Sequence, residues 1–173
     1  MKSIGITLAL IALSGCTTLG DIPTQRVARV DLRQANGTPA GTAILTAAGD
    51  KLTLSVAAIG LAEGLHGLHL HMVGACDGPA FTTAGPHLNP AGHQHGTSNP
   101  AGSHLGDLPN LAIGKQGAGA ISADLAGPRA AAEAAIFDAD GTALVIHAGA
   151  DDYATDPSGS SGARIACGII KRN

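Results

Sequence analysis

Aromatic residues are nearly absent from this sequence of 173 residues, which has two phenylalanines, one tyrosine and no tryptophan. A chain of this length still suits one domain with a substantial core. Because hydrophobic residues make up 45% of the sequence, that core must be built from alanine, valine, leucine and isoleucine. The 25 glycines indicate many turns between short elements.

An excess of positive charge is also lacking. The sequence has 10 lysines and arginines against 13 acidic residues, which gives a formal net charge of −3. Domains that bind nucleic acid usually present a basic surface. The charge therefore predicts that nucleic acid is not a partner of this protein.

The apolar run near the N-terminus is short. Residues 4–13 follow a single basic residue, Lys2, and are too few to span a membrane, but they are typical of a secretory signal. The Leu-Ser-Gly-Cys that follows at residues 13–16 resembles a bacterial lipobox, in which the cysteine is lipidated and becomes the mature N-terminus. An ordinary signal with an incidental cysteine is the alternative interpretation.

This pattern predicts a lipoprotein signal peptide at residues 1–15, a lipidated tether at residues 16–25 and one domain at residues 26–173. Cleavage removes Lys2 as the only charged residue and leaves a formal charge of −4. We expect an exported protein of the periplasm or cell envelope, in contact with a membrane only through the lipid on Cys16.

The sequence is also poor in cysteine, with three residues. If Cys16 carries the lipid, Cys76 and Cys167 are left as a pair. Exported proteins reside in oxidising compartments, where such pairs form disulfides. We therefore expect these two cysteines to be bonded to each other.

Short strands separated by turn residues are predicted in the first part of the domain. Residues 26–33 form a β-like run that ends at the Asn-Gly of residues 36–37, a strong hairpin signal. Residues 42–46 form a second run, which the Gly-Asp at residues 49–50 turns back. Apolar and polar residues then alternate over residues 52–56, as in a half-buried strand.

Further strands are expected near the C-terminus. Residues 136–137 and 143–146 flank an Asp-Gly pair and predict a hairpin, and residues 163–170 predict a last strand. The alanine-rich residues 130–135 favour a helix by propensity alone. Because they adjoin the hairpin, we interpret them as a strand.

Two long stretches lack strand character, residues 72–115 and 148–163. Loops of this length in a compact domain are usually functional or disordered, and the first contains histidines and Asp107. Short, regularly spaced strands with glycine turns indicate an all-β fold, an antiparallel sandwich or a flattened barrel. We therefore expect a β-sandwich with two long functional loops.

Histidines form the most informative pattern in the chain. His69 and His71 flank a single residue, so on a β-strand both rings point to one face while Leu70 points to the other. Two imidazoles about 7 Å apart along a strand are able to converge on one ion. Together with His147, at the end of the apolar run 143–146, they would make a site that suits copper.

A second set of ligands follows in the first long stretch, with the spacing His87-x7-His95-x8-His104-x2-Asp107. Three imidazoles and one carboxylate are the donors of a closed, tetrahedral zinc site. The carboxylate offsets part of the charge of the zinc ion. The two sites have room to share one histidine.

Four ordered motifs resemble those of the copper/zinc superoxide dismutases, in particular the exported bacterial members. They are Gly-Leu-His-Leu-His at residues 67–71, Gly-Pro-His-Leu-Asn-Pro at 85–90, His-Leu-Gly-Asp-Leu-Pro at 104–109 and Gly-Ala-Arg-Ile-Ala-Cys-Gly at 162–168. The likeness extends from about residue 26 to residue 170, nearly all of the mature chain.

This resemblance implies a Greek-key β-sandwich that converts superoxide to oxygen and hydrogen peroxide with one copper and one zinc ion per chain. His87 would bridge the two metals. The family's copper ligands match His69, His71, His87 and His147, and its zinc ligands match His87, His95, His104 and Asp107.

The resemblance also implies roles outside the ligand sets. Asp151 matches a carboxylate that hydrogen-bonds one ligand of each metal, and Arg164 matches the arginine beside the copper that attracts the anionic substrate. Arg164 and His87 would therefore be the catalytic residues. Cys76 and Cys167 match the disulfide that fastens the long loop to the last strand.

Some residues fall outside the family pattern. His66 and His93 match no ligand, and we expect each to be structural or exposed. Asp152 is expected to be a surface acid. Residues 153–162 contain a single aspartate as their only charge, whereas eukaryotic members carry a guidance segment rich in glutamate and lysine. Electrostatic guidance beyond Arg164 is therefore not identified.

Two other functions stay open. One is a non-catalytic lipoprotein of the same fold that binds zinc or copper, and the other is a purely structural exported sandwich. Loss of a copper ligand or of Arg164 would favour the first, and loss of the zinc ligands would favour the second. All of these residues are present, so the enzyme is favoured. Members of the family occur as monomers and as homodimers, and the sequence does not choose between them.

Overall fold

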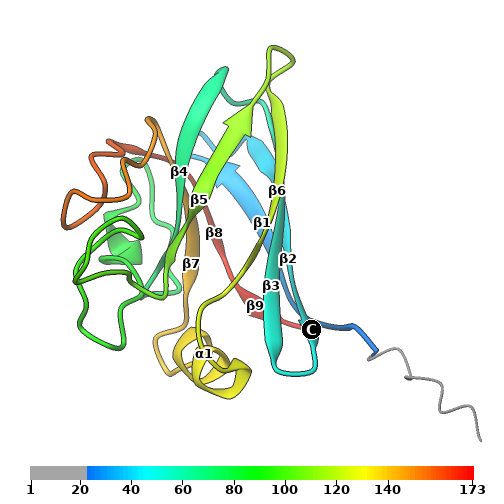
Figure 1. Cartoon of the computed structure of the whole chain (residues 1–173). Coiled ribbons are helices and arrows are strands. Elements are labelled where there is room, and N and C mark those ends of the chain that lie inside the picture. The colour runs from blue at the N-terminus through cyan, green and yellow to red at the C-terminus, as the bar shows by residue number, and fades with distance from the viewer. Residues whose placement is uncertain (1–22) are drawn as a thin grey trace, which may run out of the picture.

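The computed structural model describes residues 23–173, and its regular structure is mainly β, with nine strands in this part of the chain (Figure 1). The predicted signal peptide, Cys16 and most of the tether lie outside the described residues. In chain order the elements are β1 (Gln25–Gln34), β2 (Pro39–Ala48), β3 (Lys51–Ile59), β4 (Gly64–His71), η1 (Thr82–Ala84), β5 (Asp107–Ile113), β6 (Ala118–Asp124), α1 (Arg129–Ile136), β7 (Ala143–His147), β8 (Arg164–Ile169) and β9 (Lys171–Arg172).

The strands form one antiparallel sheet that curls into a flattened, nearly closed barrel (Figure 1). Its hydrogen-bonded order is β5-β4-β7-β8-β1-β2-β3-β6, and β9 also pairs with β1. The end strands β5 and β6 are joined by a tight turn, in which the Gly114 amide donates to the Ala118 carbonyl at 3.0 Å. The connections from β3 to β4 and from β6 to β7 cross between the two halves, as in a Greek key. The predicted all-β Greek-key fold is confirmed.

The core follows the alternation seen in the sequence. Leu52, Leu54 and Val56 of β3 are at most 3% exposed, and they pack with Leu32 of β1 and Leu45 of β2 in one apolar cluster. In contrast, all five residues of β7 are buried, because this central strand is covered on both faces. Aliphatic side chains fill the core, as the scarcity of aromatic residues predicts.

The interpretation of residues 130–135 as a strand is wrong, because Arg129–Ile136 form helix α1. Alanine has the highest helix propensity, and an ion pair between Arg129 and Glu133 (2.6 Å) adds support one turn apart. Ala132 and Ile136, four residues apart, are the buried positions. The sequence predicts a strand here because residues 136–137 are expected to form a hairpin with residues 143–146. Residues 136–137 instead form the end of the helix and do not pair with β7.

Two predicted boundaries also need correction. Residues 72–115 are not one long loop, because Asp107–Ile113 form β5 and pair with β4. Pro109 argues against a strand in the sequence, because proline lacks an amide hydrogen for the sheet. The proline is tolerated here because it lies opposite the register shift between His66 and Leu68 in β4. Gln25, assigned to the tether, is the first residue of β1.

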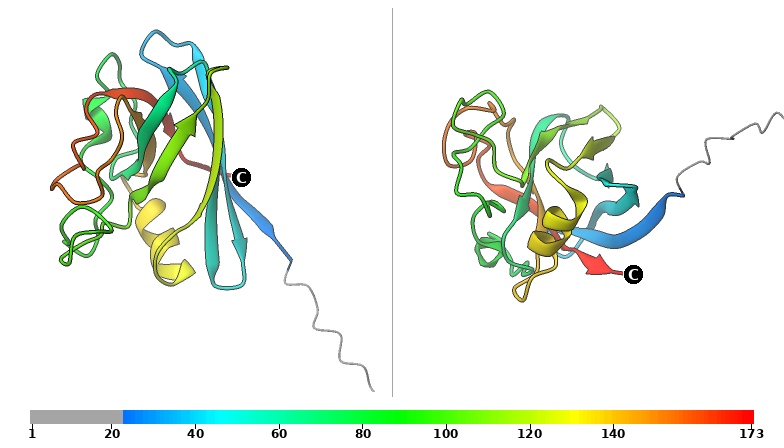
Figure 2. Two further views of the ribbon diagram at one scale, coloured as in Figure 1. Left: turned by 45° about the horizontal axis from the view of Figure 1, so that its top comes forward. Right: turned by 60° about the horizontal axis from the view of Figure 1, so that its bottom comes forward.

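The two long connections lie together on one side of the barrel. Residues 72–106 link β4 to β5 and residues 148–163 link β7 to β8, and both lie on the side away from β9 and from the start of β1 (Figures 1 and 2). The expected pair of long loops is therefore present. Within residues 23–173, no helix has both the length and the apolar character needed to cross a membrane.

Candidate metal centre

Three buried histidines at the ends of β4 and β7 face one another. The strands pair with His69 opposite Val145, which brings His147, at the end of β7, beside the rings of His69 and His71. His87 is held against β4 by a bridge to His71. One nitrogen from each of the four rings lies within 4.8 Å of the other three. We call this set the first cluster.

Hydrogen bonds on the outer edges of three rings determine which nitrogen faces inward. Nδ1 of His71 donates to the Gly85 carbonyl at 2.8 Å, and Nδ1 of His147 donates to a carbonyl of the second long loop at 3.1 Å. Nε2 of His69 donates to Asp151 at 2.8 Å. The other nitrogen of each ring is buried without a hydrogen-bond partner in the described part of the chain. A neutral imidazole that donates outward keeps a lone pair inward, as a metal ligand must.

Asp107 is the centre of a second cluster of imidazole nitrogens. Nδ1 of His87, of His95 and of His104 lie 3.0, 3.0 and 3.1 Å from its Oδ1 atom. A carboxylate oxygen has two lone pairs and is unable to accept three hydrogen bonds at once. A tetrahedral ion with bonds of about 2.0 Å holds its ligand atoms about 3.3 Å apart. The spacing is thus that of four ligands around one cation.

His69 also lies within 4.8 Å of three members of this second cluster. Its Nε2 is hydrogen-bonded to Asp151, and its Nδ1 is a free, buried nitrogen that the first cluster uses. His104 is therefore the better fourth member of the second cluster, because its Nδ1 already contacts Asp107.

His87 lies between the two clusters. Its Nδ1 contacts Asp107 in the second cluster, and its Nε2 is buried and lacks a hydrogen-bond partner among residues 23–173. Its ring centroid is 4.0 Å from that of His69 and 5.2 Å from that of His95. One imidazole thus presents a different nitrogen to each cluster.

Asp107 is held in its ionised form. Its Oδ2 accepts hydrogen bonds from the amides of Gly96 (2.9 Å) and His104 (3.0 Å). Burial opposes ionisation, but the hydrogen bonds with His87 and with these two amides outweigh it and lower the pKa of the Asp107 carboxyl. The anion offsets part of the charge of a divalent cation.

Asp151 connects the two clusters through hydrogen bonds to ring nitrogens that face away from them. One carboxylate oxygen accepts from Nε2 of His69 at 2.8 Å, and the other accepts from Nε2 of His95 at 3.0 Å. The side chain of Asn110 in β5 holds the backbone of Asp151 through two hydrogen bonds of 2.8 Å. The backbone N–H of Asp151 donates to Oδ1 of Asn110, and Nδ2 of Asn110 donates to the backbone carbonyl of Asp151. Asp151 therefore orients one ring of each cluster.

Burial keeps three rings of the first cluster, those of His71, His87 and His147, neutral. It lowers the pKa of His71 to about 2, of His147 to about 3 and of His87 to about 4. Neutral imidazole is the form that binds a metal ion. At neutral pH these rings are therefore ready to accept a cation without first losing a proton.

The two donor sets fit copper and zinc. Four imidazole nitrogens, three of them fixed by hydrogen bonds on the opposite ring nitrogen, suit copper. Three imidazoles and one carboxylate suit a closed zinc site. The buried nitrogens without partners are the observation that supports this fit, because leaving such groups unsatisfied is costly.

Cys76 and Cys167 form the predicted disulfide, which spans 91 residues and joins the first long loop to β8. The same loop carries η1, and β8 begins at Arg164. The crosslink therefore fixes the loop against the strand that carries the arginine.

Arg164 is held by the first long loop. Its guanidinium donates to the carbonyls of Phe81 and Gly85, each at 2.6 Å. The Gly85 carbonyl also accepts from His71, so the arginine and a ring of the first cluster share one acceptor. Burial lowers the pKa of Arg164, but a guanidinium stays charged at physiological pH.

A surface depression of about 430 Å³ lies beside this arginine. Arg164 is the only charged residue among those that line it, which are Pro79, Ala80, Gly162, Ala163 and Arg164. The absence of other charges here agrees with the sequence, which lacks the guidance segment of the eukaryotic members.

The residues expected to lie outside the ligand sets do so. His66 is buried, with Nδ1 2.7 Å from the His147 carbonyl and Nε2 3.0 Å from the Ala62 carbonyl, so its role is structural. His93 is exposed. Asp152 is exposed as well, but it also accepts hydrogen bonds from the amides of the following turn.

Sequence reasoning missed two residues that support the centre, Asn110 and Gly159. Gly159 has a φ of +63°, and a Cβ atom there would collide with the carboxylate of Asp151. Asn110 was assigned to a loop and not to a strand, so its contact with Asp151 had no signal in the pattern. Neither residue has a spacing that marks it as functional.

The family model of copper/zinc superoxide dismutase (SODC) matches residues 39–170 of this chain. A Superoxide dismutase (Cu-Zn) of Caulobacter vibrioides is 38% identical over 146 residues, which cover 81% of this chain and 83% of the relative. The protein of the same name from Deinococcus radiodurans is 35% identical over 173 residues, 93% of this chain and 91% of the relative.

Solved structures show the same relationship. A SOD-like protein from Bacillus subtilis superposes with a TM-score of 0.76 at 36% identity, covering 83% of this chain and 97% of that one. Cu/Zn superoxide dismutase from Brucella abortus superposes with a TM-score of 0.67 at 26% identity, covering 86% and 100%. The match of sequence, fold and donor sets shows that the chain belongs to the copper/zinc superoxide dismutase family.

Proposed function

We propose that the protein disproportionates superoxide, so that two superoxide anions and two protons give one oxygen and one hydrogen peroxide molecule. The observation that carries the proposal is His87, which presents a buried nitrogen to each of two metal-binding clusters. When bound, copper supplies the one-electron redox chemistry, which zinc is unable to supply. We assign copper to His69, His71, His87 and His147, and zinc to His87, His95, His104 and Asp107.

His87 is the proposed proton donor to the peroxide product. Its Nδ1 belongs to the second cluster, which holds the ring in place while Nε2 gains or loses a proton. Nε2 is buried and has no hydrogen-bond partner among the described residues. The inward lone pairs of His69, His71 and His147 would be used as metal ligands, so a proton held at Nε2 would pass to the substrate.

Arg164 is the proposed residue that orients the substrate. Two of its N–H groups donate to the carbonyls of Phe81 and Gly85, which fixes the plane of the guanidinium. The remaining N–H groups are available to a small anion in the depression that Arg164 lines. Because His71 shares the Gly85 carbonyl, the guanidinium lies beside a ring of the first cluster.

Metal analysis combined with a superoxide disproportionation assay on the mature protein tests this proposal. We expect about one copper and one zinc per chain and rapid loss of superoxide after a pulse. Bound metal without turnover would support the non-catalytic metal-binding lipoprotein instead. Failure to retain either metal after loading would contradict the ligand assignments.

We also propose that the protein is exported and held on a membrane by a lipid on Cys16. The signal-like residues 1–15 before Cys16 support export, and so does the disulfide, since disulfides persist in oxidising compartments. Wild-type protein should fractionate with membranes, and Cys16→Ser should be soluble or unprocessed. A wild type recovered as free periplasmic protein would contradict the anchor but not the activity.

A further inference from the structure

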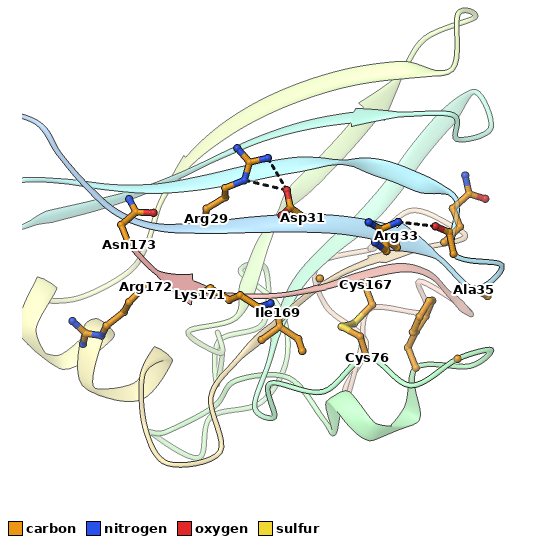
Figure 3. A pocket seen from close by; sticks show the side chains of 15 residues that line it. Arg29, Asp31, Arg33, Ala35, Cys76, Cys167, Ile169, Lys171, Arg172 and Asn173 are labelled. Atoms are coloured by element: carbon orange, nitrogen blue, oxygen red, sulfur yellow. Dashed lines mark hydrogen bonds and ion pairs between the residues drawn. A yellow bond between two sulfur atoms is a disulfide. The ribbon is translucent and has the colours of Figure 1, made fainter.

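A groove of about 630 Å³ runs along the outer surface where β1, β8 and β9 meet (Figure 3). Four cationic side chains line it, and Asp31 is the only acidic side chain among the lining residues. The cations are Arg29, Arg33, Lys171 and Arg172. We call this feature the basic groove, and neither metal-binding cluster uses it.

The basic groove has the opposite charge to the rest of the molecule. Residues 23–173 contain nine lysines and arginines and twelve acidic residues. Four of these basic residues and one of these acidic residues line the groove. The rest of residues 23–173 therefore contains five basic and eleven acidic residues. A terminal carboxylate on Asn173 would still leave the groove positive. Its potential is therefore a local feature of a negatively charged protein.

Strand geometry places three of these cations, Arg29, Arg33 and Lys171, on one face. Arg29 and Arg33 occupy exposed positions of β1 that alternate with buried ones. Lys171 of β9 lies directly opposite Arg29 in the register, and directly opposed residues of an antiparallel pair point to the same face. These three side chains thus project from one surface, whereas Arg172, which follows Lys171 in the strand, places its guanidinium over the Phe137 ring.

Most of this charge is not neutralised within the chain. Arg29 is paired with Asp31 at 2.7 Å, but Arg33, Lys171 and Arg172 form no salt bridge within the described residues. Arg33 donates to a backbone carbonyl, and Arg172 stacks over an aromatic ring at 3.9 Å. Their remaining N–H groups are available to external anions.

The groove lies where the tether enters the domain. β1 begins at Gln25, and the amide of Asn173 beside β9 donates to the Val27 carbonyl at 3.1 Å. Eight residues separate Cys16 from Gln25, and extended chain spans at most about 28 Å over that length. Cys76, Gly78 and Phe81 of the first long loop also border the groove, but none of the metal-binding residues lines it. A membrane that holds the tether therefore lies near the β9 end of the groove.

We propose that the basic groove docks the protein on a bilayer that contains anionic phospholipids, whose phosphates its cations contact. The expected orientation rests on the proposed lipid anchor. The attraction itself does not, because the cations are present whether or not Cys16 is lipidated. Each lysine or arginine near an anionic membrane surface contributes about fivefold to the binding constant.

Sedimentation with lipid vesicles tests the docking. Metal-loaded mature Cys16→Ser protein should bind vesicles of phosphatidylcholine mixed with phosphatidylglycerol, should not bind phosphatidylcholine alone, and should dissociate as salt screens the charges. Lys171→Gln should weaken binding about fivefold, and Arg33→Gln combined with Lys171→Gln about 25-fold. Lys115→Gln is the matched control, since it removes the same charge from the exposed turn between β5 and β6.

Equal losses in Lys171→Gln and Lys115→Gln would overturn the proposal, because only net charge would then matter. Equal binding to neutral vesicles would overturn it too, and so would groove-dependent binding to a soluble polyanion such as heparin without binding to vesicles. Superoxide turnover, measured on the same samples, should be the same in Lys171→Gln and in the Cys16→Ser parent. This comparison separates a failure of docking from a failure of the proposed enzymatic function.

Discussion

The half of the barrel formed by β1, β2 and β3 and the half that carries the metal centre bury different kinds of side chain. In the first half the buried residues are aliphatic, such as Leu32, Leu45 and Leu54. In the second half His69, His71 and His95 are all completely buried. Apolar burial is favourable by itself, whereas a buried polar atom needs a partner. The packing of the first half therefore needs no ligand, whereas the buried imidazole nitrogens of the second half need one as a partner.

This contrast also shows where each half tolerates change. A substitution in the aliphatic half alters packing and hence the free energy of unfolding, with little effect on the metal centre. A substitution in the metal half alters ligand geometry, because hydrogen bonds such as those of Asp151 to His69 and His95 leave little freedom. The following predictions test whether stability and activity separate in this way.

The largest effect is expected for His147→Ala. Replacing even residues that only orient metal ligands lowers metal affinity 10- to 100-fold, so loss of a ligand should lower copper affinity more than about 100-fold and remove essentially all turnover. Zinc should be retained, since the second cluster does not include His147. Metal analysis and the superoxide assay measure both effects. His93→Ala, an exposed histidine, is the control and should keep both metals, and full activity in His147→Ala would refute the copper assignment.

The next effect is expected for the Cys76→Ser, Cys167→Ser double variant. Removing a crosslink that closes a loop of 91 residues should lower the free energy of unfolding by about 4.6 kcal/mol on the chain-entropy model. Chemical denaturation measures the loss. Wild type in reductant should fall to the value of the variant, while the variant should not respond to reductant. Two titratable thiols at these positions in the denatured, unreduced mature protein would contradict the predicted bond in solution.

In the aliphatic half, Leu54→Ala should lower the free energy of unfolding by about 3 kcal/mol, because it leaves a cavity in the core. Leu54 is 1% exposed. Copper, zinc and turnover per folded molecule should stay at wild-type values. Leu65→Ala is the matched control, since Leu65 is 53% exposed and should change stability little. Loss of metal in Leu54→Ala at temperatures where it is folded would show that the halves are not separable.

The smallest of these effects is expected for Arg164→Ala, which should lower catalytic efficiency about tenfold while keeping both metals. Attraction of an anion by a local charge weakens as salt rises, since screening at about 0.15 M acts beyond about 8 Å. Wild-type activity should therefore fall with salt, and the fall should be shallower in Arg164→Ala. Lys115→Ala removes a charge distant in the fold and should keep the wild-type slope. Wild-type rate and slope in Arg164→Ala would mean that guidance comes from elsewhere.

The order and spacing of residues were enough to predict much of both halves. Alternation over residues 52–56 predicts β3 and its buried face, because side chains of a strand point alternately to two sides. The spacing of His69 and His71 places both rings on one face for the same reason. The expected export to an oxidising compartment predicts the disulfide between Cys76 and Cys167. Each of these features depends on local geometry or on composition, which the sequence contains directly.

The tertiary structure alone decided the features that depend on distant partners. Residues 130–135 belong to a helix and pair with no strand of the described sheet, which the neighbouring sequence does not reveal. The clamp of Asn110 on Asp151 joins residues 41 positions apart. The basic groove likewise forms because β9 returns to pair with β1. Helix propensity, alternation of apolar residues and ligand spacing are properties of a segment and its neighbours in the sequence. Burial and hydrogen bonds between distant segments exist only in the folded chain.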